Sequence, residues 1–418
     1  MRFRLFYLNW LVFVYAFYCY FNRGVAYSYL VEATWLLGIF LIIKNIKSYI
    51  ISWDKKTKLL LFLITICAAF MVRGIMHYPL IDVIRDSFMI NYSGFVFIAF
   101  YLRNELPILK QKIANVYKWF PLIVTIGFLL RSFIPYFAEL QFFGEIPFLV
   151  YKNGDLAVHL LIATFFLMNG KTELNKRFTI LNVILIGYLF LITATFNRSG
   201  MLSYLVGISV FLYFSRKTDL AKRYFSYVKF IPIVLIIALP IYMSTKVKDK
   251  AQGRDVGVSQ LKDNITSMVK PGSEKNGLND NVIWRLVWWG KIIDYTFGGE
   301  YFVAGKGLGV NLSEDDDIAM EDDSLRSPHN FHLNILARFG VPIFFLWIYW
   351  LSLILAEFKN KRLSSEHLTY LCILLAFLVN ASFDVALEGP MSAFPFWLIL
   401  GILFVSQTFY NSEHTSEI

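Results

Sequence analysis

Residues 178–214 have the sequence FTILNVILIGYLFLITATFNRSGMLSYLVGISVFLYF, and this stretch decides the fold class. Two apolar runs, 178–196 and 199–214, are separated only by a short polar junction that contains Arg198. A helix needs about 20 mostly apolar residues to cross a bilayer, and each run approaches that length. The stretch therefore predicts a tight hairpin of two membrane-spanning helices.

The composition of the whole chain agrees with a membrane protein. Of its 418 residues, 57% are hydrophobic, 18% are aromatic and only 17% are charged, whereas soluble domains carry about 25% charged residues. A soluble fold could not bury this much apolar surface. Cys19, Cys67 and Cys372 all lie in apolar runs, which argues against a disulfide framework or a cysteine metal site.

Apolar runs of spanning length predict an all-α polytopic membrane protein with about 12 transmembrane helices. The predicted spans are 4–21, 25–43, 58–73, 84–102, 116–135, 155–170, 178–196, 199–214, 229–244, 339–357, 367–385 and 390–410. We expect residues 1–244 to hold spans 1–9. One long outward-facing loop at 245–338 follows, and residues 339–418 hold spans 10–12 and a short cytoplasmic tail.

Lysines and arginines orient these spans, because positively charged short loops stay in the cytoplasm. The N-terminus and the alternate short loops carry 22 basic residues, and the short loops on the other side carry six. Both termini are therefore predicted to be cytoplasmic. The long loop holds 12 basic and 14 acidic residues, so the net charge of +10 reflects membrane topology and does not indicate a nucleic-acid surface.

Ionisable residues of the spans gather near the predicted outer ends of the helices. They are Arg73, Arg85, Asp86, Arg131, Asp155, Arg198, Asp384 and Glu388. Charged groups within a membrane are costly, so their placement points to function. A proton-coupled carrier would need acidic residues through the middle of the membrane, where only Glu32 and His159 are candidates. The pattern therefore favours chemistry at the outer face over transport.

Two arginines are placed to bind an anion at the outer leaflet. Arg198 ends one span and begins the next, and Arg285 lies in 281–295, which is predicted to be an amphipathic helix. Trp284 and Trp288 of this segment suit the membrane interface, which puts Arg285 at headgroup depth. A guanidinium group binds two phosphate oxygens at once. The structural alternative is an arginine that merely snorkels to the interface.

A histidine follows in a segment that predicts the start of a helix. Ser327 is the expected N-cap and Pro328 the first helical residue. His329 would then lie in the first turn, where the positive end of the helix dipole disfavours imidazolium. A neutral imidazole accepts a proton, so His329 is the candidate general base. A purely structural histidine is the alternative, and it is the stronger interpretation for His332.

Two further features of the long loop are not assigned to catalysis. The run Gly305-Lys306-Gly307-Leu308-Gly309 lacks the ending of a nucleotide-binding loop, so we expect a tight turn or close packing. The acidic residues at 314–317 and 321–323 are expected to form a solvated loop, because they lack the regular spacing of metal ligands.

The order of these motifs resembles the O-antigen ligase and polymerase (Wzy-type) superfamily of bacterial membrane glycosyltransferases. The resemblance covers the twelve-span layout and is sharpest over about 195–345. It rests on Arg198 at its span end, on Arg285 before the tryptophans and the glycine-rich turn, and on His329-Asn330 followed by Gly340 after nine residues. Two positions depart from the ligase-like pattern, which expects Gly, Thr or Tyr where Ile343 stands and often an acidic residue near Arg338.

The resemblance implies a donor oligosaccharide linked to undecaprenyl diphosphate at the outer face of the bacterial inner membrane. The glycan would be transferred to a hydroxyl of an acceptor glycan or glycolipid with inversion, without a nucleotide sugar, cofactor or metal. Arg285 and Arg198 would hold the diphosphate, and His329 would deprotonate the acceptor. The residues predicted to contact substrate are Asn330, Arg85, Arg73, His332 and Trp288.

Several alternatives stay open at this level. The departures at Arg338 and Ile343 slightly favour a polymerase over a ligase that uses lipid A–core. A transporter of polysaccharide or lipid-linked sugar and a catalytically silent scaffold are further possibilities, although the chain has no internal repeat of the kind that transporters carry. Membrane lipid is an expected partner, a chain-length regulator is left open, and no nucleic acid is expected.

Overall fold

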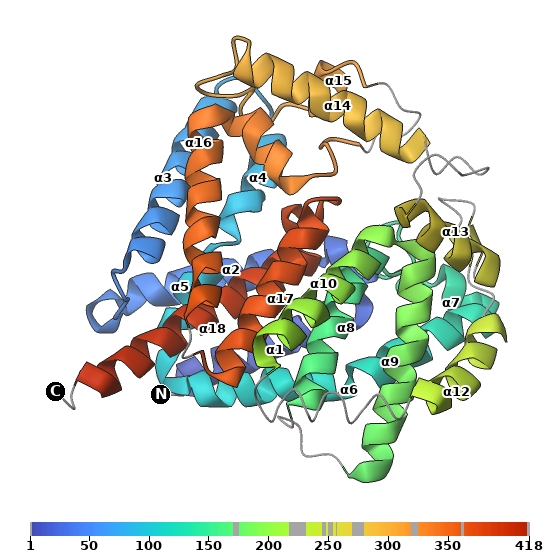
Figure 1. The fold of residues 1–418 in the computed structure, drawn as a ribbon. Helices are drawn as coiled ribbons and strands as arrows, with labels where there is room; N and C mark the ends of the chain where they lie inside the picture. Colours follow the sequence, from blue (N-terminus) through green and yellow to red (C-terminus); the bar gives the residue numbers. More distant parts are fainter. Residues whose placement is uncertain are drawn as a thin grey trace. The chain divides into compact units, whose positions relative to one another are not determined.

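The computed structural model describes residues 2–169, 175–216, 231–244, 248–249, 254–255, 257–269, 280–318, 325–360 and 363–415. Apart from loops, these residues are almost all helical (Figure 1). The exceptions are an isolated bridge between Gln141 and Pro147 and one antiparallel pair of two-residue strands, β1 (Lys248–Asp249) and β2 (Arg254–Asp255). The predicted all-α class is confirmed. The acidic stretch at 321–323 lies outside the described residues.

Six helical segments within the described residues are long and apolar enough to cross a membrane. They are Phe3–Ser28, Lys55–Ile75, Arg103–Phe133, Lys176–Phe196, Phe331–Lys359 and Pro390–Gln407. The pair Leu80–Asn91 and Gly94–Tyr101, bent by 55°, raises this number to seven if it is one span. Two shorter apolar helices are Asn153–Met168 and Ser365–Ala381. The chain is a membrane protein, and the count of about 12 spans stays a prediction.

The helices cluster into two compact units, and each draws on segments that are far apart in the sequence. The first comprises Met1–Lys47, Tyr101–Ser273 and Leu363–Asn380, and the second Ser48–Phe100, Glu274–Arg362 and Ala381–Ile418. The division of the chain at residues 244 and 338 stays a prediction.

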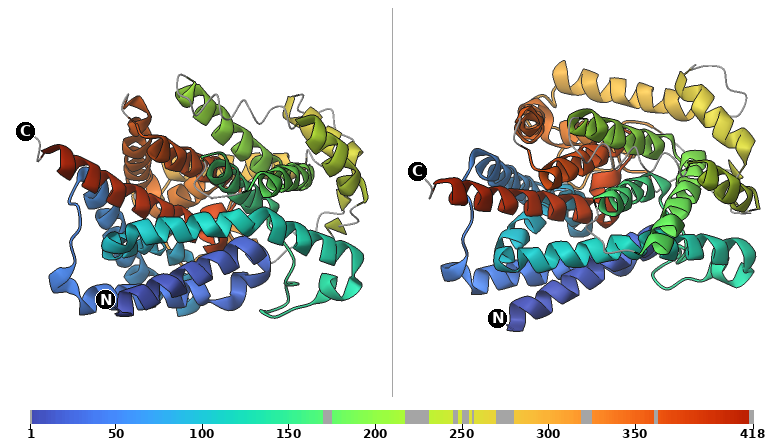
Figure 2. Two further views of the ribbon diagram at one scale, coloured as in Figure 1. Left: turned by 90° about the horizontal axis from the view of Figure 1, so that it is seen from below. Right: turned by 60° about the horizontal axis from the view of Figure 1, so that its bottom comes forward.

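The first unit is built around a helix that is buried on all sides. Its elements are α1 (Arg2–Phe21), η1 (Asn22–Ser28), α2 (Leu30–Lys44), η3 (Arg103–Glu105), α6 (Leu106–Phe133), α7 (Pro135–Glu139), α8 (Asn153–Met168), α9 (Lys176–Phe196), α10 (Arg198–Ser215), α12 (Ile231–Ser244), α13 (Val258–Val269) and most of α17 (Ser365–Ala381). Nearly every residue of α8 is buried, because α6, α9 and α10 pack around it. Helices α1 and α6 run side by side in both views of Figure 2.

A chain of hydrogen-bonded polar side chains lies inside this unit. His159 on α8 shares a 2.9 Å hydrogen bond with the Tyr117 hydroxyl, which in turn pairs with the Tyr15 hydroxyl at 2.8 Å. A buried polar group needs such a partner because it has left water. The pairing gives His159 a structural role that joins α1, α6 and α8.

Helix α13 lies in the predicted outward loop, where the only helices expected from the sequence were 281–295 and the one that begins near Ser327. Asn264 lies on this helix, and its side-chain amide donates to the backbone carbonyl oxygens of Ala194 and Thr195 at the end of α9. The isolated polar sequence did not predict a helix, because its stabilising partner is more than 60 residues away.

The second unit contains residues 280–318 and 325–338 of the loop that is predicted to face outward, together with helices from other segments of the chain. Its elements are α3 (Lys55–Ile75), α4 (Leu80–Asn91), α5 (Gly94–Tyr101), α14 (Asp280–Phe297), α15 (Leu312–Asp315), α16 (Phe331–Leu355), η4 (Ala356–Lys359), η5 (Ala386–Glu388) and α18 (Pro390–Thr415), and η2 (Ile46–Ser48) lies at the boundary with the first unit. Within this unit α16 packs against both α3 and α14.

Helix α16 is broken at Gly340 and folds back on itself. Gly340 has φ +80° and ψ 179°, a conformation that only glycine adopts easily. The Trp347 indole nitrogen reaches Nδ1 of His332 at 3.1 Å, although these residues would be about 22 Å apart along a straight helix. The predicted start of the tenth span at residue 339 coincides with this break.

The glycine-rich turn completes the hydrogen bonding that the break leaves open. Pro342 has no N–H, so the Arg338 carbonyl lacks its helical donor, and the Gly307 N–H supplies one at 2.9 Å. The Lys306 N–H likewise donates to the Ala337 carbonyl at 2.8 Å. The predicted close packing of the turn is confirmed, and its partner is the broken helix.

The Gly340→Ala variant tests this break. A Cβ at Gly340 would lie 2.6 Å from the Phe302 carbonyl oxygen in a backbone conformation that alanine disfavours. We expect a loss of at least about 1–3 kcal/mol in unfolding free energy, measured as a lower midpoint of thermal unfolding in detergent. The matched control is Gly290→Ala in α14, where an added Cβ meets nothing within 4 Å. The control should be neutral or slightly stabilising, and equal effects would contradict the assignment.

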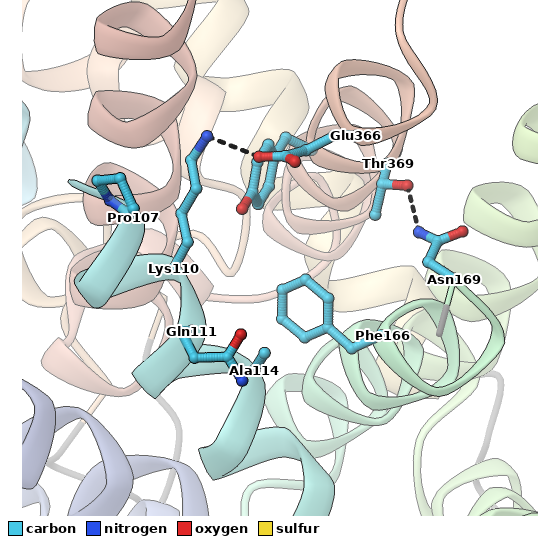
Figure 3. A pocket seen from close by; sticks show the side chains of 9 residues that line it. Pro107, Lys110, Gln111, Ala114, Phe166, Asn169, Glu366 and Thr369 are labelled. Carbon is cyan, nitrogen blue, oxygen red and sulfur yellow. Dashed lines mark hydrogen bonds and ion pairs between the residues drawn. The ribbon is translucent and has the colours of Figure 1, made fainter. Parts of the chain in front are cut away.

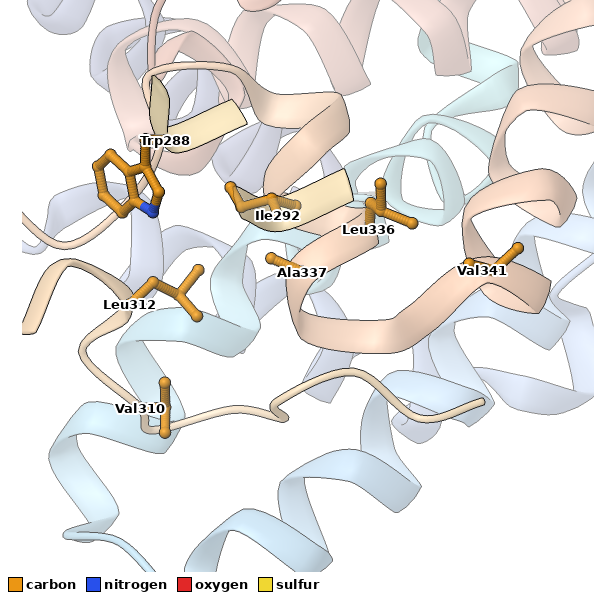
Figure 4. Packing of buried hydrophobic residues seen from close by; sticks show 7 residues of the cluster. All are labelled: Trp288, Ile292, Val310, Leu312, Leu336, Ala337 and Val341. Atoms are coloured by element: carbon orange, nitrogen blue, oxygen red, sulfur yellow. The ribbon is translucent and has the colours of Figure 1, made fainter. Parts of the chain in front are cut away.

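Helix α14 packs on α16 through a small apolar cluster. The cluster contains Trp288, Ile292, Val310, Leu312, Leu336, Ala337 and Val341 (Figure 4). The opposite side of α14 is exposed and apolar, with Ile283, Leu286, Val287, Ile293 and Phe297. We had expected the tryptophans to face the membrane interface, but Trp288 is fully buried, and aliphatic residues and Phe297 form the exposed face. Both faces of this helix are apolar, so its sequence alone did not distinguish them.

Candidate functional site

Two predicted catalytic residues come together around Trp284 in the second unit. The Arg285 guanidinium carbon lies 5.4 Å from the centre of the Trp284 ring. The His329 imidazole meets the same ring edge to face, with ring centres 5.6 Å apart and planes at 86°. Arg285 also donates from Nη1 to the Phe383 carbonyl at 3.2 Å. A cation and a proton acceptor therefore lie against the same aromatic ring.

His329 does not lie in the first turn of a helix, contrary to the prediction from the sequence. Asn330 is the N-cap of α16, because its side-chain oxygen accepts from the N–H groups of His332 at 3.0 Å and Leu333 at 3.1 Å. Asparagine caps helices as well as serine does, and it stands three residues later than Ser327. The helix therefore begins at Phe331, and His329 precedes its N-cap.

The backbone at His329 is held in an uncommon conformation. Its φ is +51°, in the left-handed region that non-glycine residues rarely occupy. The Trp289 indole N–H donates to the Pro328 carbonyl at 2.7 Å and fixes the preceding residue. Backbone strain of this kind concentrates at functional sites. The conformation places the imidazole against Trp284.

Asp384 is a further member of this site, and the sequence had not assigned it a role. Its Oδ1 lies 3.9 Å from Nδ1 of His329, and the two side chains are 11% and 29% exposed. The same oxygen accepts from the N–H of Val385 at 2.7 Å, which orients the carboxylate. A carboxylate at this distance stabilises imidazolium once His329 has taken a proton. Its only signal in the sequence was an acidic residue at the outer end of a predicted span.

The other predicted substrate contacts have structural partners. Asn330 caps α16, and His332 accepts the Trp347 indole N–H at its Nδ1. An indole N–H only donates, so Nδ1 of His332 carries the lone pair and Nε2 the proton. Trp288 is fully buried, and its indole N–H donates to Asp316 at 2.6 Å. Their roles in substrate binding stay predictions, and the burial of Trp288 does not favour one.

Asp316 is the centre of a second buried cluster that holds α14 to the loop below it. Its carboxylate accepts from Trp288 and Lys306, and its backbone carbonyl accepts from Lys291 at 2.8 Å. Burial alone would lower the pKa of Lys306, but hydrogen bonds to Asp315 and Asp316 outweigh it and raise that pKa. Asp316 is therefore buried and ion-paired, contrary to the expectation of a solvated loop, whereas Glu314, Asp315 and Asp317 are exposed as expected.

Arg85 and Arg73 also belong to the second unit, where they contact other residues than those around His329. Arg85 forms an ion pair with Asp82 and lies 3.9 Å from Asp86. Arg73 is exposed in the last turn of α3, with its guanidinium carbon 6.0 Å from the centre of the Phe70 ring. Their assignment to substrate binding stays a prediction.

Arg338 and Asp86 form a buried ion pair that fixes the glycine-rich turn. Arg338 is 1% exposed, and its Nη1 lies 2.7 Å from Oδ2 of Asp86. The guanidinium also donates to Asn334, to the Gly307 carbonyl and to the Val310 carbonyl. Asp86 in turn accepts from the Gly309 N–H at 2.9 Å. Arg338 departs from the ligase-like pattern, and its contacts give it a structural role.

Arg198 lies in the first unit, at the first position of α10. Asn197 ends α9 and caps α10, because its side chain accepts from the Gly200 N–H at 2.7 Å. Gly200 is required there, since an added Cβ would lie 2.9 Å from Cβ of Ala157 on α8. The predicted tight hairpin is confirmed, and it fixes the backbone on both sides of Arg198.

A polar network surrounds this junction. The Ser199 hydroxyl donates to the side-chain oxygen of Asn380 at 3.1 Å, and the Asn380 amide donates to Asp155 at 3.0 Å. Asp155 is fully buried in the first turn of α8, and Lys152 lies 3.7 Å from its carboxylate. The network connects α8, α10 and α17 beside Arg198.

The first unit also has a small pocket of about 230 Å³ at the other end of α8. Lys110 pairs with Glu366 at 2.6 Å on one side, Asn169 donates to Thr369 at 2.8 Å on another, and Phe166 lines the floor (Figure 3). Phe166 and Asp155 are 11 residues apart on α8, or about 16 Å along the helix. The pocket is therefore separate from the network at Arg198.

The residues that the structure describes hold no group of three or more His, Cys, Asp or Glu side chains that could bind a metal ion.

Comparison with known families agrees with the motif order. No curated protein matches the chain. Residues 156–348 match the family model described as O-Antigen ligase, a range that includes Arg198, Arg285, His329 and Gly340. This match identifies residues 156–348 as an O-antigen ligase family domain, which indicates a membrane enzyme of the O-antigen ligase and polymerase type.

Proposed function

We propose that the protein is an inverting glycosyltransferase that uses an undecaprenyl-diphosphate-linked oligosaccharide. It transfers the glycan to a sugar hydroxyl at the outer face of the bacterial inner membrane, and both termini are cytoplasmic. The observation that carries the proposal is the grouping of His329, Arg285 and Asp384 around Trp284. This grouping offers a proton acceptor, a cation for a leaving phosphate and a carboxylate for the charge formed on the imidazole.

The chemistry follows from these three groups. With Nδ1 of His329 protonated and directed at Asp384, Nε2 is the nitrogen that accepts the proton of the acceptor hydroxyl. The acceptor oxygen then forms a bond to the anomeric carbon as the bond from that carbon to the diphosphate oxygen breaks. Arg285 stabilises the negative charge on the departing diphosphate. No metal is needed for this step in our proposal. The role of Arg198 as a second guanidinium stays a prediction from the resemblance.

We favour a polymerase, in which a second lipid-linked repeat is the acceptor. Support for this choice comes from Ile343, where the ligase-like pattern expects Gly, Thr or Tyr. Arg338, the other departure from that pattern, has a structural role, so it no longer favours a polymerase. A ligase that uses lipid A–core is the second candidate, because the matching family model carries the description O-Antigen ligase. A chain-length regulator is a proposed partner of the polymerase only.

A gel of envelope glycans tests the proposal and separates the two candidates. The strains are a deletion strain and the same strain complemented with wild type or His329→Ala. Lipid A–core with one repeat and no ladder in the deletion strain would identify a polymerase. Lipid-linked polymer that never reaches lipid A–core would identify a ligase. We expect His329→Ala to match the deletion strain, and full restoration by this variant would refute the catalytic role of His329.

A further inference from the structure

The three tryptophans of α14 differ in how their indole N–H groups are used. Trp288 donates to Asp316 at 2.6 Å, and Trp289 donates to the Pro328 carbonyl at 2.7 Å. The indole nitrogen of Trp284 is also buried, but among the residues that the structure describes nothing accepts its hydrogen. Buried indole N–H groups normally find a partner, so this exception requires an explanation.

The surroundings of Trp284 indicate what the missing acceptor is. The guanidinium of Arg285 lies 5.4 Å from the centre of the indole ring, and the imidazole of His329 lies edge to face on it. The N–H therefore belongs to the same cluster as the cation and the base. A buried neutral donor gains most from a charged acceptor. An oxygen of a diphosphate that binds Arg285 would bring that charge close to the indole ring.

We infer that Trp284 is a substrate-binding residue whose indole N–H donates to a phosphate oxygen of the lipid-linked diphosphate donor. The inference rests on the proposed function and adds a residue that the sequence-based site did not include, since Trp288 had been predicted instead. Trp284 also packs against His329, so one side chain contacts both the leaving group and the general base. In this arrangement Trp284 sets the distance between the imidazole of His329 and the diphosphate.

The test measures binding of undecaprenyl diphosphate without glycan to the purified full-length protein in detergent or nanodiscs. The variant is Trp284→Phe, which keeps an aromatic ring at the position beside His329 and removes the N–H together with the five-membered part of the indole. We expect its Kd to rise about 10- to 100-fold, the loss of one hydrogen bond to a charged group. The thermal midpoint of the ligand-free protein should fall less than it does when a tryptophan with an internally bonded N–H is replaced, because the smaller ring leaves a void but no hydrogen bond within the protein is lost.

The matched control is Trp289→Phe, in which an N–H bonded to the protein itself is lost. Its ligand-free thermal midpoint should fall, and its Kd should change much less than that of Trp284→Phe. If Trp284→Phe lowered the midpoint as much as the control, the N–H would have a partner within the protein and the inference would be wrong.

Two other outcomes would overturn the inference. Unchanged affinity of Trp284→Phe for the lipid diphosphate, with a raised KM only for the glycan-bearing donor, would assign the N–H to a sugar hydroxyl. Unchanged affinity and unchanged KM would give the residue a packing role alone. In both cases the wild type still binds, so the proposed function stands. Failure of the wild type to bind undecaprenyl diphosphate would overturn the proposed function and the inference with it.

Discussion

Replacing His329 by glutamine is expected to lower the rate of glycan transfer by about 10²- to 10⁴-fold, the usual contribution of a positioned general base. Glutamine is similar in size and keeps hydrogen-bonding capacity, but it cannot accept a proton from the acceptor hydroxyl. The affinity for the donor should change little, because Arg285 and Trp284 remain. The measurement is the initial rate with purified protein and lipid-linked donor at saturating donor concentration.

Two further variants make this result specific. Asp384→Asn should also lower the rate, but less, because the base remains and only the charge that stabilises imidazolium is lost. The matched control is His367→Gln, since this histidine lies near the beginning of α17 in the first unit. It should keep nearly the wild-type rate. A rate for His329→Gln within a few-fold of the wild type would give the imidazole a structural role instead.

Replacing Arg338 by methionine is expected to destabilise the protein by about 3–5 kcal/mol, the effect of removing one partner of a buried ion pair. The carboxylate of Asp86 is 6% exposed, so it would be left charged and without its closest cation. The carbonyls of Gly307 and Val310 would also lose a donor. The measurement is the midpoint of thermal unfolding in detergent, and the double variant Arg338→Met with Asp86→Asn should recover part of the loss.

Arg85→Met is the matched control for this prediction. Arg85 also faces Asp86, but its Nε is 3.9 Å from the carboxylate and its side chain is 52% exposed. An exposed ion pair contributes about 0–1 kcal/mol, because water and salt screen it. A control as destabilised as Arg338→Met would mean that burial does not set the strength of this pair. An unaffected Arg338→Met protein would remove the ion pair from the architecture of the turn.

The sequence by itself determined those features that depend on neighbouring residues. Apolar length placed a helix at each predicted span, and two apolar runs with only a short polar junction between them indicated the hairpin at Arg198. The order of Arg198, Arg285 and His329 led to the family that residues 156–348 match. These signals are local, so they are present before the chain folds.

The tertiary structure decided which of several similar residues serves the site. From the sequence, Ser327 was the expected cap and Trp288 a substrate contact, whereas in the structure Asn330 is the cap and Trp284 lies beside His329. The local chemistry of serine and asparagine, and of the two tryptophans, is too similar to separate them. Asp384 and the Arg338–Asp86 pair depended on contacts between segments 55 to more than 250 residues apart. Burial, hydrogen-bond partners and charge pairing are set by these distant contacts, which form only in the folded chain.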